Sequence, residues 1–314
     1  GSTKRNPREY ERLLKTGMGQ VEVMNRRKFL IGAAASQLAA SLMTAPVSAA
    51  APPSRKIRQG LMPTVWRGSN FTIEQRCQAL ARIGYVSMDL PSVADVDIMR
   101  KHGLVPGIMT GGAGGTSFQN GTIRKEMHDS FEKATQEGID LCARAGCANL
   151  FVFPGELRGM SRQEAADNTV AFFNRFKGYA EQKGVTLCME NTNSKVVADQ
   201  RTDQAFDHVD WGFDICKRVN SPNVKILYDI YHAQVSDGDI ARTLRDNIQW
   251  ICHIHVAGDP GRLEIDDTQE LNYRFLAKVI AETGFKGVVA HEWRLSPGHE
   301  MIATLEQCFR IMDV

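Results

Sequence analysis

Short runs of β-branched and other apolar residues alternate with longer segments of helical periodicity from residue 56 to the end of the chain. The runs predict strands at residues 57–62, 85–90, 105–109, 149–153, 185–190, 224–229, 251–256 and 287–292. The segments that follow them predict helices near residues 72–83, 92–102, 122–145, 161–183, 205–219, 236–248, 271–283 and 298–311. Strands that alternate with helices imply a parallel sheet with right-handed crossovers.

Turn residues support this division of the chain. Glycines stand between a helix and the next strand at positions 84, 103, 146, 184 and 284, where a left-handed C-cap is expected. Ser92, Thr122 and Ser161 are the predicted N-caps. Eight strand–helix units in about 255 residues match a (β/α)8 barrel in count and size. The alternative is an open doubly wound sheet, but no G-x-G-x-x-G follows the first strand. The predicted fold is therefore α/β, a single (β/α)8 TIM barrel over residues 56–314.

The first 49 residues differ in composition from the rest. They carry eight Lys and Arg against three Asp and Glu, and the stretch from Phe29 to Ala51 is uncharged. A basic region, an apolar region and the small residues Val47-Ser48-Ala49 follow one another in the order of an export signal. The segment Asn25-Arg26-Arg27-Lys28-Phe29-Leu30 resembles the twin-arginine motif, which sends folded proteins across a bacterial inner membrane.

These features divide the chain into four segments. Residues 1–23 read as an upstream extension with a cloning remnant at Gly1-Ser2, residues 24–49 as a twin-arginine-type signal peptide, residues 50–55 as a linker and residues 56–314 as the catalytic barrel. We expect a periplasmic protein with no stable membrane anchor after signal cleavage. The alternative, an amphipathic N-terminal helix, explains neither the paired arginines nor the small residues that end the segment.

Charge and cysteine usage exclude several classes of protein. The whole chain has a formal net charge of +2, but residues 50–314 hold 30 Lys and Arg against 33 Asp and Glu. A mildly acidic domain argues against a nucleic-acid partner, because such binders carry a strong basic stripe. No apolar run reaches the roughly 20 residues of a membrane span. The seven cysteines form no C-x-x-C pair, and several lie in apolar runs, so we expect buried thiols.

Four predicted strands of the second half end in side chains that can bind a metal ion: Glu190, Asp229, His255 and Glu292. The active site of such a barrel lies at the carboxyl ends of its strands. Neighbouring strands lie about 4.8 Å apart, so inward side chains on consecutive strands can reach one ion. Carboxylates that would repel one another in a buried site attract a shared divalent cation. Three oxygens and one imidazole suit Mg²⁺, Mn²⁺ or Co²⁺ better than a structural zinc site.

Other polar residues lie near the same end of the predicted barrel. His253 is two residues before His255 and faces the same way, and we interpret it as a hydrogen-bonded core histidine. Asp89 ends the second strand and Glu156 follows the fourth, so both could add carboxylates to the pocket.

Several segments resemble the hydroxypyruvate isomerase family and, more broadly, the xylose-isomerase-like TIM barrel superfamily, which includes ketose 3-epimerases. The matching segments are Met189-Glu190-Asn191-Thr192-Asn193, Tyr228-Asp229-Ile230-Tyr231-His232, His253-Ile254-His255-Val256-Ala257, Asp259-Pro260-Gly261-Arg262 and Glu270-Leu271-Asn272-Tyr273. The resemblance covers residues 56–314 in layout and is sharpest from 185 to 293. It is specific for the superfamily and leaves the individual reaction open.

The resemblance implies a role for each matching residue. Glu190, Asp229, His255 and Glu292 fall on the family's metal ligands, and Glu190 and Glu292 also fall on its two acid–base carboxylates. His232 and Arg262 fall on positions that hold substrate oxygens. The alternatives are a helix-start hydrogen bond for His232 and a surface salt bridge with Glu264 for Arg262. Glu156 and Trp66 complete the expected substrate-binding set. Members of the superfamily often pair, so a homo-oligomer is also expected.

The expected chemistry is a metal-dependent isomerisation or epimerisation of a small sugar or keto acid. One glutamate removes a proton next to the carbonyl, the cation stabilises the resulting enediolate, and the second glutamate returns a proton. The alternative is a lyase that uses the same enolate to cleave 3-keto-glycosides. A metal-dependent abasic-site endonuclease would need more histidine ligands and a basic face. A binding protein without activity would hold a sugar through the metal alone.

Overall fold

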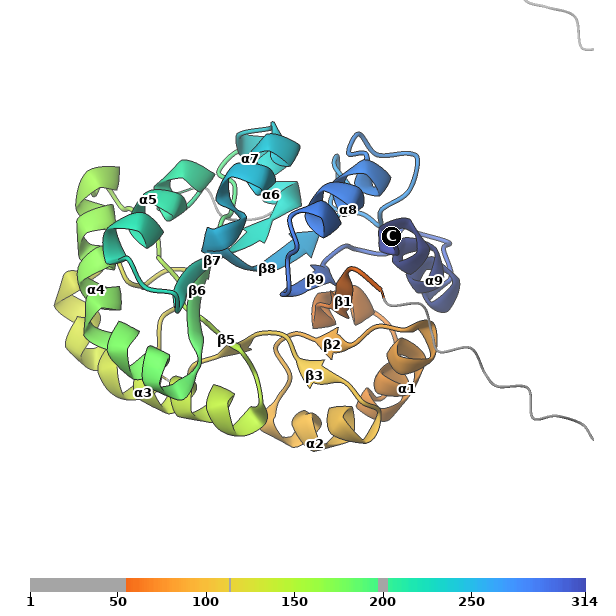
Figure 1. The fold of residues 1–314 in the computed structure, drawn as a ribbon, viewed down its shortest axis with the longest axis horizontal. Coiled ribbons are helices and arrows are strands. Elements are labelled where there is room, and N and C mark those ends of the chain that lie inside the picture. The colour runs from red at the N-terminus through yellow and green to blue at the C-terminus, as the bar shows by residue number, and fades with distance from the viewer. Residues whose placement is uncertain (1–54, 113, 197–202) are drawn as a thin grey trace, which may run out of the picture. The chain divides into compact units, whose positions relative to one another are not determined.

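A computed structural model describes residues 55–112, 114–196 and 203–314. The compact unit that begins at Pro53 contains one parallel sheet, drawn in Figure 1 with helices around it. Its strands are β1 (Arg58–Leu61), β2 (Ser87–Met88), β3 (Val105–Pro106), β4 (Met109–Thr110), β5 (Asn149–Phe151), β6 (Thr186–Glu190), β7 (Val224–Asp229), β8 (Ile251–Val256) and β9 (Val288–His291). They lie in the order β3-β2-β1-β9-β8-β7-β6-β5-β4, and every pair is parallel. The predicted barrel is thus confirmed as a nearly closed ring.

The two ends of the sheet meet at the predicted third strand, which the structure divides into β3 and β4. β3 pairs with β2, whereas β4 pairs with β5. Between them, the N–H of Leu90 donates to the carbonyl of Ile108 at 2.8 Å, so pairing with the second strand continues past the break. Pro106 has no N–H to donate and Gly107 has no side chain to pack, which is the physical reason for the interruption.

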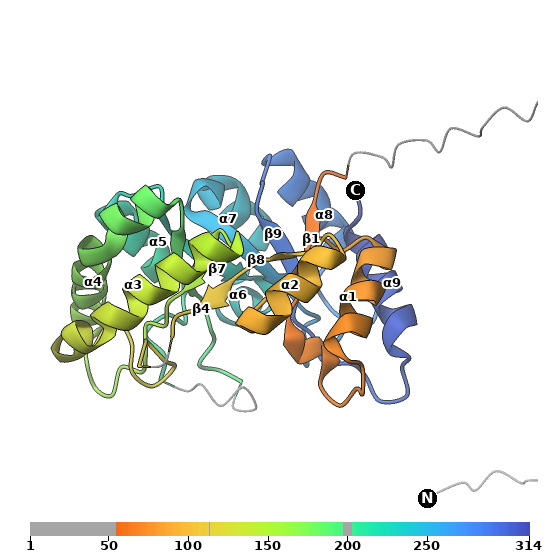
Figure 2. The same ribbon diagram turned by 90° about the horizontal axis from the view of Figure 1, so that it is seen from below.

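Helices cover the outside of the sheet, as Figures 1 and 2 show. They are α1 (Ile73–Ile83), α2 (Val93–Lys101), α3 (His128–Ala145), α4 (Arg162–Lys183), α5 (Val209–Val219), α6 (Ile230–Ser236), α7 (Ile240–Asn247), α8 (Tyr273–Glu282) and α9 (Met301–Met312). A 3-10 turn, η2 (Pro63–Trp66), follows β1. Within the described ranges, no helix is both long and apolar enough to cross a membrane.

Most predicted helix ends are confirmed, and one is wrong. Ser92 and Ser161 accept hydrogen bonds from the N–H of Asp95 and Glu164 and cap α2 and α4. The five predicted glycines all have positive φ. Thr122 is no N-cap: its buried hydroxyl bonds to Thr169, and α3 begins only at residue 128. The structure also contains α6, which the periodicity did not predict because it occupies only seven residues directly after β7.

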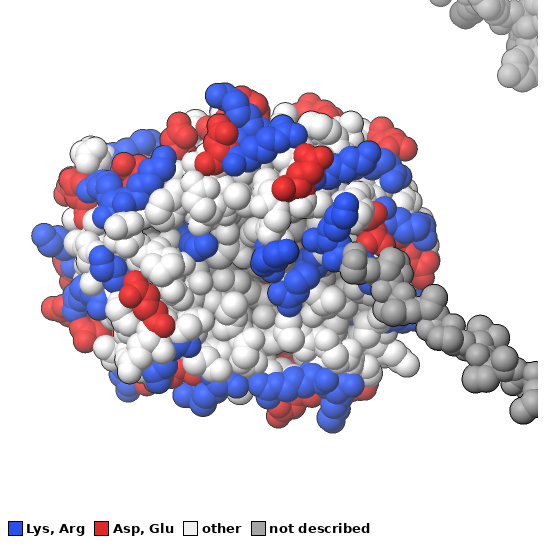
Figure 3. Space-filling model, in the orientation of Figure 1, with Lys and Arg blue, Asp and Glu red and all other residues white. Residues whose placement is uncertain are grey.

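The thiols and the surface charge agree with the composition. All seven cysteines are free, and each is buried except Cys252, which is partly exposed. Figure 3 shows one face of the molecule, on which acidic and basic side chains are interspersed and gather mainly at the periphery. The predicted signal peptide at residues 24–49, and the segments on either side of it up to residue 54, lie outside the described residues.

Candidate metal and active site

Four acidic and histidine side chains converge at the carboxyl ends of β6, β7, β8 and β9. Glu190, Asp229, His255 and Glu292 each offer a ligand atom, and these atoms lie within 4.8 Å of one another. We call these residues the four-residue group. Asp229 pairs with His255 across β7 and β8, while Glu190 and Glu292 come from the strands on either side. The exposed fractions of the four residues are 9% or less, so the group is buried.

His255 lies at the centre of the hydrogen bonding within this group. Its Nδ1 atom is 3.1 Å from Oε1 of Glu190 and 2.8 Å from Oε2 of Glu292. Its Nε2 atom faces away from both, toward Oδ2 of Asp89 at 3.0 Å. One ring nitrogen therefore belongs to the four-residue group and the other to a neighbouring carboxylate.

The position of Asp229 is determined by backbone as well as side-chain contacts. The side chain of Asn191 accepts the N–H of Asp229 at 2.8 Å and donates to its carbonyl at 3.0 Å. Oδ1 of Asp229 accepts the N–H of His232 and caps α6. Hydrogen bonds thus fix the backbone and Oδ1 of Asp229, and Oδ2 is the oxygen that faces the other members of the group.

Arg262 donates to two members of the group rather than to the surface partner considered from the sequence. Its Nη2 atom lies 3.0 Å from Oδ2 of Asp229 and 2.7 Å from Oε2 of Glu292. The side chain is 11% exposed. The guanidinium therefore neutralises part of the carboxylate charge at the mouth of the site.

The buried charges shift one another's proton affinities. Burial raises the pKa of Asp229 to about 7 despite Arg262, and the nearby carboxylates of Glu190 and Glu292 contribute to the rise. Burial acts in the same direction on Glu292, but Arg262 and His255 outweigh it and hold its pKa well below the usual value. Burial would lower the pKa of His255, yet Glu292 and the other nearby carboxylates raise it well above the ordinary range. The group therefore holds more negative charge than Arg262 alone can balance.

The donor set fits a divalent cation. Three carboxylates and one imidazole from a barrel interior match the ligands that Mg²⁺, Mn²⁺ and Co²⁺ accept. A cation would also supply the positive charge that the buried carboxylates require. Glu190, Asp229, His255 and Glu292 are the residues that could hold it.

The remaining predicted substrate residues lie in different surroundings. His232 is fully buried, with Nδ1 at 2.7 Å from the amide nitrogen of Asn193 and Nε2 at 3.6 Å from Oδ2 of Asp229. Trp66 ends η2 and is buried, and its indole N–H has no hydrogen-bond partner among the described residues. The carboxylate of Glu156 is not a member of the group and forms a salt bridge with Arg158 at 3.1 Å instead.

Two asparagines contribute to the site although the sequence alone indicated no role for them. Asn191 orients Asp229, and Asn193 orients His232. Both belong to the segment that follows Glu190, so a signal was present in the pattern of polar residues at that strand end. Their partners lie 38 and 39 residues away, which only the folded chain could reveal.

Comparison with known proteins agrees with this architecture. Residues 96–310 match the family described as xylose isomerase-like TIM barrel. Over 119 residues the chain is 36% identical to 2-oxo-tetronate isomerase of Cupriavidus necator, covering 38% of this chain and 44% of that protein. It is 25% identical to the putative hydroxypyruvate isomerase of Danio rerio, covering 52% and 61%. These matches span only about half of each relative's length.

Solved structures share the fold at low sequence identity. A crystal structure titled AP endonuclease, family 2, from Brucella melitensis has a TM-score of 0.68 and 21% identity, covering 79% of this chain and 97% of that one. Several sugar epimerases have a similar fold. Because the family match extends over more than half of the residues, the chain belongs to the xylose isomerase-like TIM barrel family.

Proposed function

We propose that this protein is a divalent-cation-dependent isomerase or epimerase that acts on a small sugar or keto acid. The observation that carries the proposal is the convergence of Glu190, Asp229, His255 and Glu292 within 4.8 Å at the carboxyl ends of consecutive strands. Two of its relatives are named isomerases, which supports the same reaction class. Hydroxypyruvate, 2-oxo-tetronate and ketoses are therefore the first substrates to test.

The two glutamates of the group are proposed as the proton-transfer residues. Glu190 ends β6 and Glu292 follows β9, so the two carboxylates reach the group from either side of β7 and β8. One carboxylate removes the proton next to the substrate carbonyl, which leaves an enediolate, and the other returns a proton. Return to the neighbouring carbon is isomerisation, and return to the opposite face of the same carbon is epimerisation.

The other site residues are proposed to bind and orient the substrate. When bound, the divalent cation supplies Lewis-acid stabilisation of negative charge on substrate oxygens. Arg262 and His232 lie beside Asp229 and can donate hydrogen bonds to oxygens of a bound sugar. The indole N–H of Trp66 provides a further donor. A small cavity beside Glu190 is lined by Phe153 and Phe206, and such apolar walls exclude water from the proton transfer.

The proposal is tested by solvent deuterium exchange. The full-length protein is supplied with Mn²⁺ or Mg²⁺ and candidate ketoses and keto acids in D₂O, and deuterium incorporation is followed by NMR. Glu292→Gln keeps the shape of the side chain but removes the carboxylate base, so exchange should fall by at least about 10²-fold. Glu264→Gln is the matched control, because Glu264 is also buried but bonds to Ser296 outside the group.

Each outcome of that experiment separates the alternatives. Normal exchange in Glu292→Gln would contradict the assignment of Glu292. Release of an aglycone from a 3-keto-glycoside would replace the isomerase by a lyase with the same enolate chemistry. Sugar binding without any proton exchange in the wild-type protein would indicate a binding protein.

We also propose that the protein is exported to the periplasm. The support is the paired Arg26 and Arg27 ahead of an uncharged stretch that ends in small residues. Replacing both arginines by lysine should leave the protein in the cytoplasmic fraction of a bacterial host. Unchanged recovery from the periplasm would refute a twin-arginine route.

A further inference from the structure

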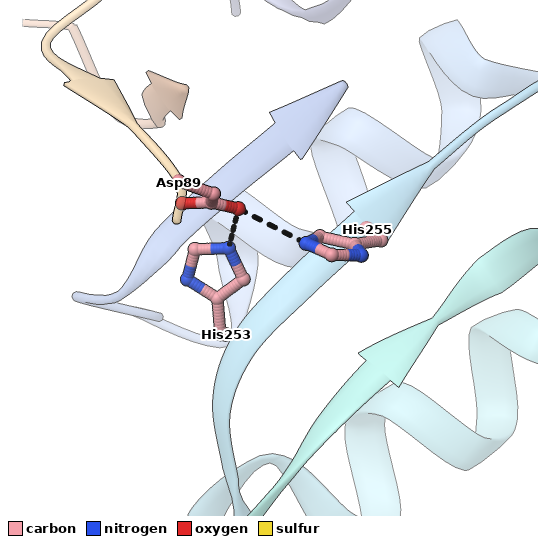
Figure 4. A group of neighbouring side chains, drawn as sticks. All are labelled: Asp89, His253 and His255. Carbon is pink, nitrogen blue, oxygen red and sulfur yellow. Dashed lines mark hydrogen bonds and ion pairs between the residues drawn. The ribbon is translucent and has the colours of Figure 1, made fainter. Parts of the chain in front are cut away.

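Asp89 lies outside the four-residue group and connects His255, a member of the group, with His253 of the same strand β8 (Figure 4). Oδ2 of Asp89 lies 2.8 Å from Nε2 of His253 and 3.0 Å from Nε2 of His255. The exposed fractions of all three residues are 1% or less. An ionised carboxylate can only accept hydrogen bonds, so each ring must donate a hydrogen bond from its Nε2–H to this one oxygen.

This arrangement decides which nitrogen of His255 is available to a cation. A neutral imidazole carries one proton, and a cation needs the other nitrogen unprotonated. In the neutral ring that binds a cation, the proton stays on Nε2 and is donated as a hydrogen bond to Asp89. The lone pair then lies on Nδ1, which faces Glu190 and Glu292 at 3.1 and 2.8 Å. Without Asp89, these two carboxylates would attract the proton to Nδ1, and the lone pair would point away from the group.

Two further features hold the Asp89 carboxylate in place. His253 lies two residues before His255 on the same strand and donates to the same oxygen. Oδ2 of Asp89 therefore accepts two hydrogen bonds, one from each ring. Gly107 leaves the space for the other oxygen: a Cβ at this position would lie 2.1 Å from Oδ1 of Asp89. The carboxylate is therefore confined between the two rings and the backbone of the third strand.

We propose that Asp89 is a positioning residue that accepts a hydrogen bond from the Nε2–H of His255 and so presents the Nδ1 lone pair to the bound cation. His253 acts with it by holding the carboxylate in the required orientation. This inference rests on the proposed function, because it assumes a cation in the four-residue group. It assigns no catalytic step to Asp89 or His253.

The test measures Mn²⁺ affinity and the proton on His255, independently of turnover. Asp89→Asn should raise the dissociation constant for Mn²⁺ by about 10–100-fold, as is typical when the hydrogen-bond partner of a metal-bound histidine is removed. His253→Leu should weaken binding less, and His253→Gln, which keeps a donor, should restore part of it. Asp207→Asn is the matched control, since Asp207 is a buried carboxylate bonded to Ser194 outside the group.

The second measurement is ¹⁵N NMR of histidine-labelled protein loaded with Mg²⁺. The Nε2 proton of His255 should be slowly exchanging in the wild-type protein and in Asp207→Asn, and this resonance should disappear or shift in Asp89→Asn. A loss of stability alone would not change the protonated nitrogen of a folded variant. If Asp89→Asn does not fold, His253→Leu and His253→Gln carry the comparison.

The outcomes distinguish this inference from the proposed function beneath it. If the wild-type protein binds no Mn²⁺ or Mg²⁺, the metal-dependent function itself fails. If the wild-type protein binds one cation and Asp89→Asn binds it equally well with the same His255 resonance, only the role of Asp89 is refuted. A second Mn²⁺ per chain that is lost in His253→Leu would also overturn it, because Asp89, His253 and His255 would then ligate that ion.

Discussion

Gly107 offers a direct way to perturb Asp89 without changing any charged residue. Replacing it by alanine would put a Cβ 2.1 Å from Oδ1 of Asp89, 2.7 Å from Oγ of Ser87 and 3.0 Å from Cε1 of His253. Its backbone does not have positive φ, so the cost comes from space and not from conformation. To restore even a 3.0 Å contact, the Asp89 carboxylate must move away from Gly107.

The expected magnitude follows from the crowding of a closely packed interior. Overpacking of this kind costs about 1–3 kcal/mol in the free energy of unfolding. The displaced carboxylate would also lengthen its bonds to His253 and His255, which are 2.8 and 3.0 Å at present. We therefore expect Gly107→Ala to unfold at lower urea concentration and to bind Mn²⁺ more weakly than the wild-type protein.

Gly178→Ala is the matched control because it is the same substitution with the opposite expectation. Gly178 lies inside α4, and an added Cβ would meet nothing within 4 Å. Alanine in an exposed helix position should raise the free energy of unfolding by about 0.8–1 kcal/mol. Both quantities are measured by urea denaturation and by Mn²⁺ titration. Equal stability and equal Mn²⁺ affinity in Gly107→Ala and the wild-type protein would refute the reasoning.

Two further predictions concern buried aromatic side chains. Burial lowers the pKa of His291 from 6.5 to about 3 in the folded protein, so its stability contribution is present above pH 6.5 and is lost as the pH falls. By pH 5 the free energy of unfolding should have fallen by about 2 kcal/mol for this reason. Urea denaturation of His291→Gln should lack this part of the pH dependence. The same pH dependence in His291→Gln and the wild-type protein would contradict the prediction. Trp66→Phe removes a donor that has no partner among the described residues. It should raise KM about fivefold, equivalent to one hydrogen bond, and an unaltered KM would exclude Trp66 from substrate binding.

Much of the fold was predictable because its signals are local. Strand and helix periodicities, the left-handed glycines and the serine caps depend on residues close in the sequence, and the structure confirms most of them. One error has a local cause and the other a distant one. The short α6 follows β7 without a loop, and Thr122 resembles an N-cap but bonds to Thr169 across the fold.

The candidate site was predictable to the extent that topology places it. In a parallel barrel the carboxyl ends of all strands meet at one end, so polar residues at four consecutive strand ends must lie near one another. The detailed contacts were not predictable. Arg262 bonds to Asp229 and Glu292 from a loop 33 and 30 residues away in the chain, and nothing local specifies its direction.

The sequence by itself determined the barrel, the end at which a site would form and the residue types available there. Only the tertiary structure decided how those residues are held. Asp89 reaches His253 and His255 across 164 and 166 residues of chain, and it does so because Gly107 leaves room on the third strand. The physical reason is that periodicity and capping depend on neighbours in sequence, whereas the direction of a ring proton depends on which distant carboxylate is packed against it.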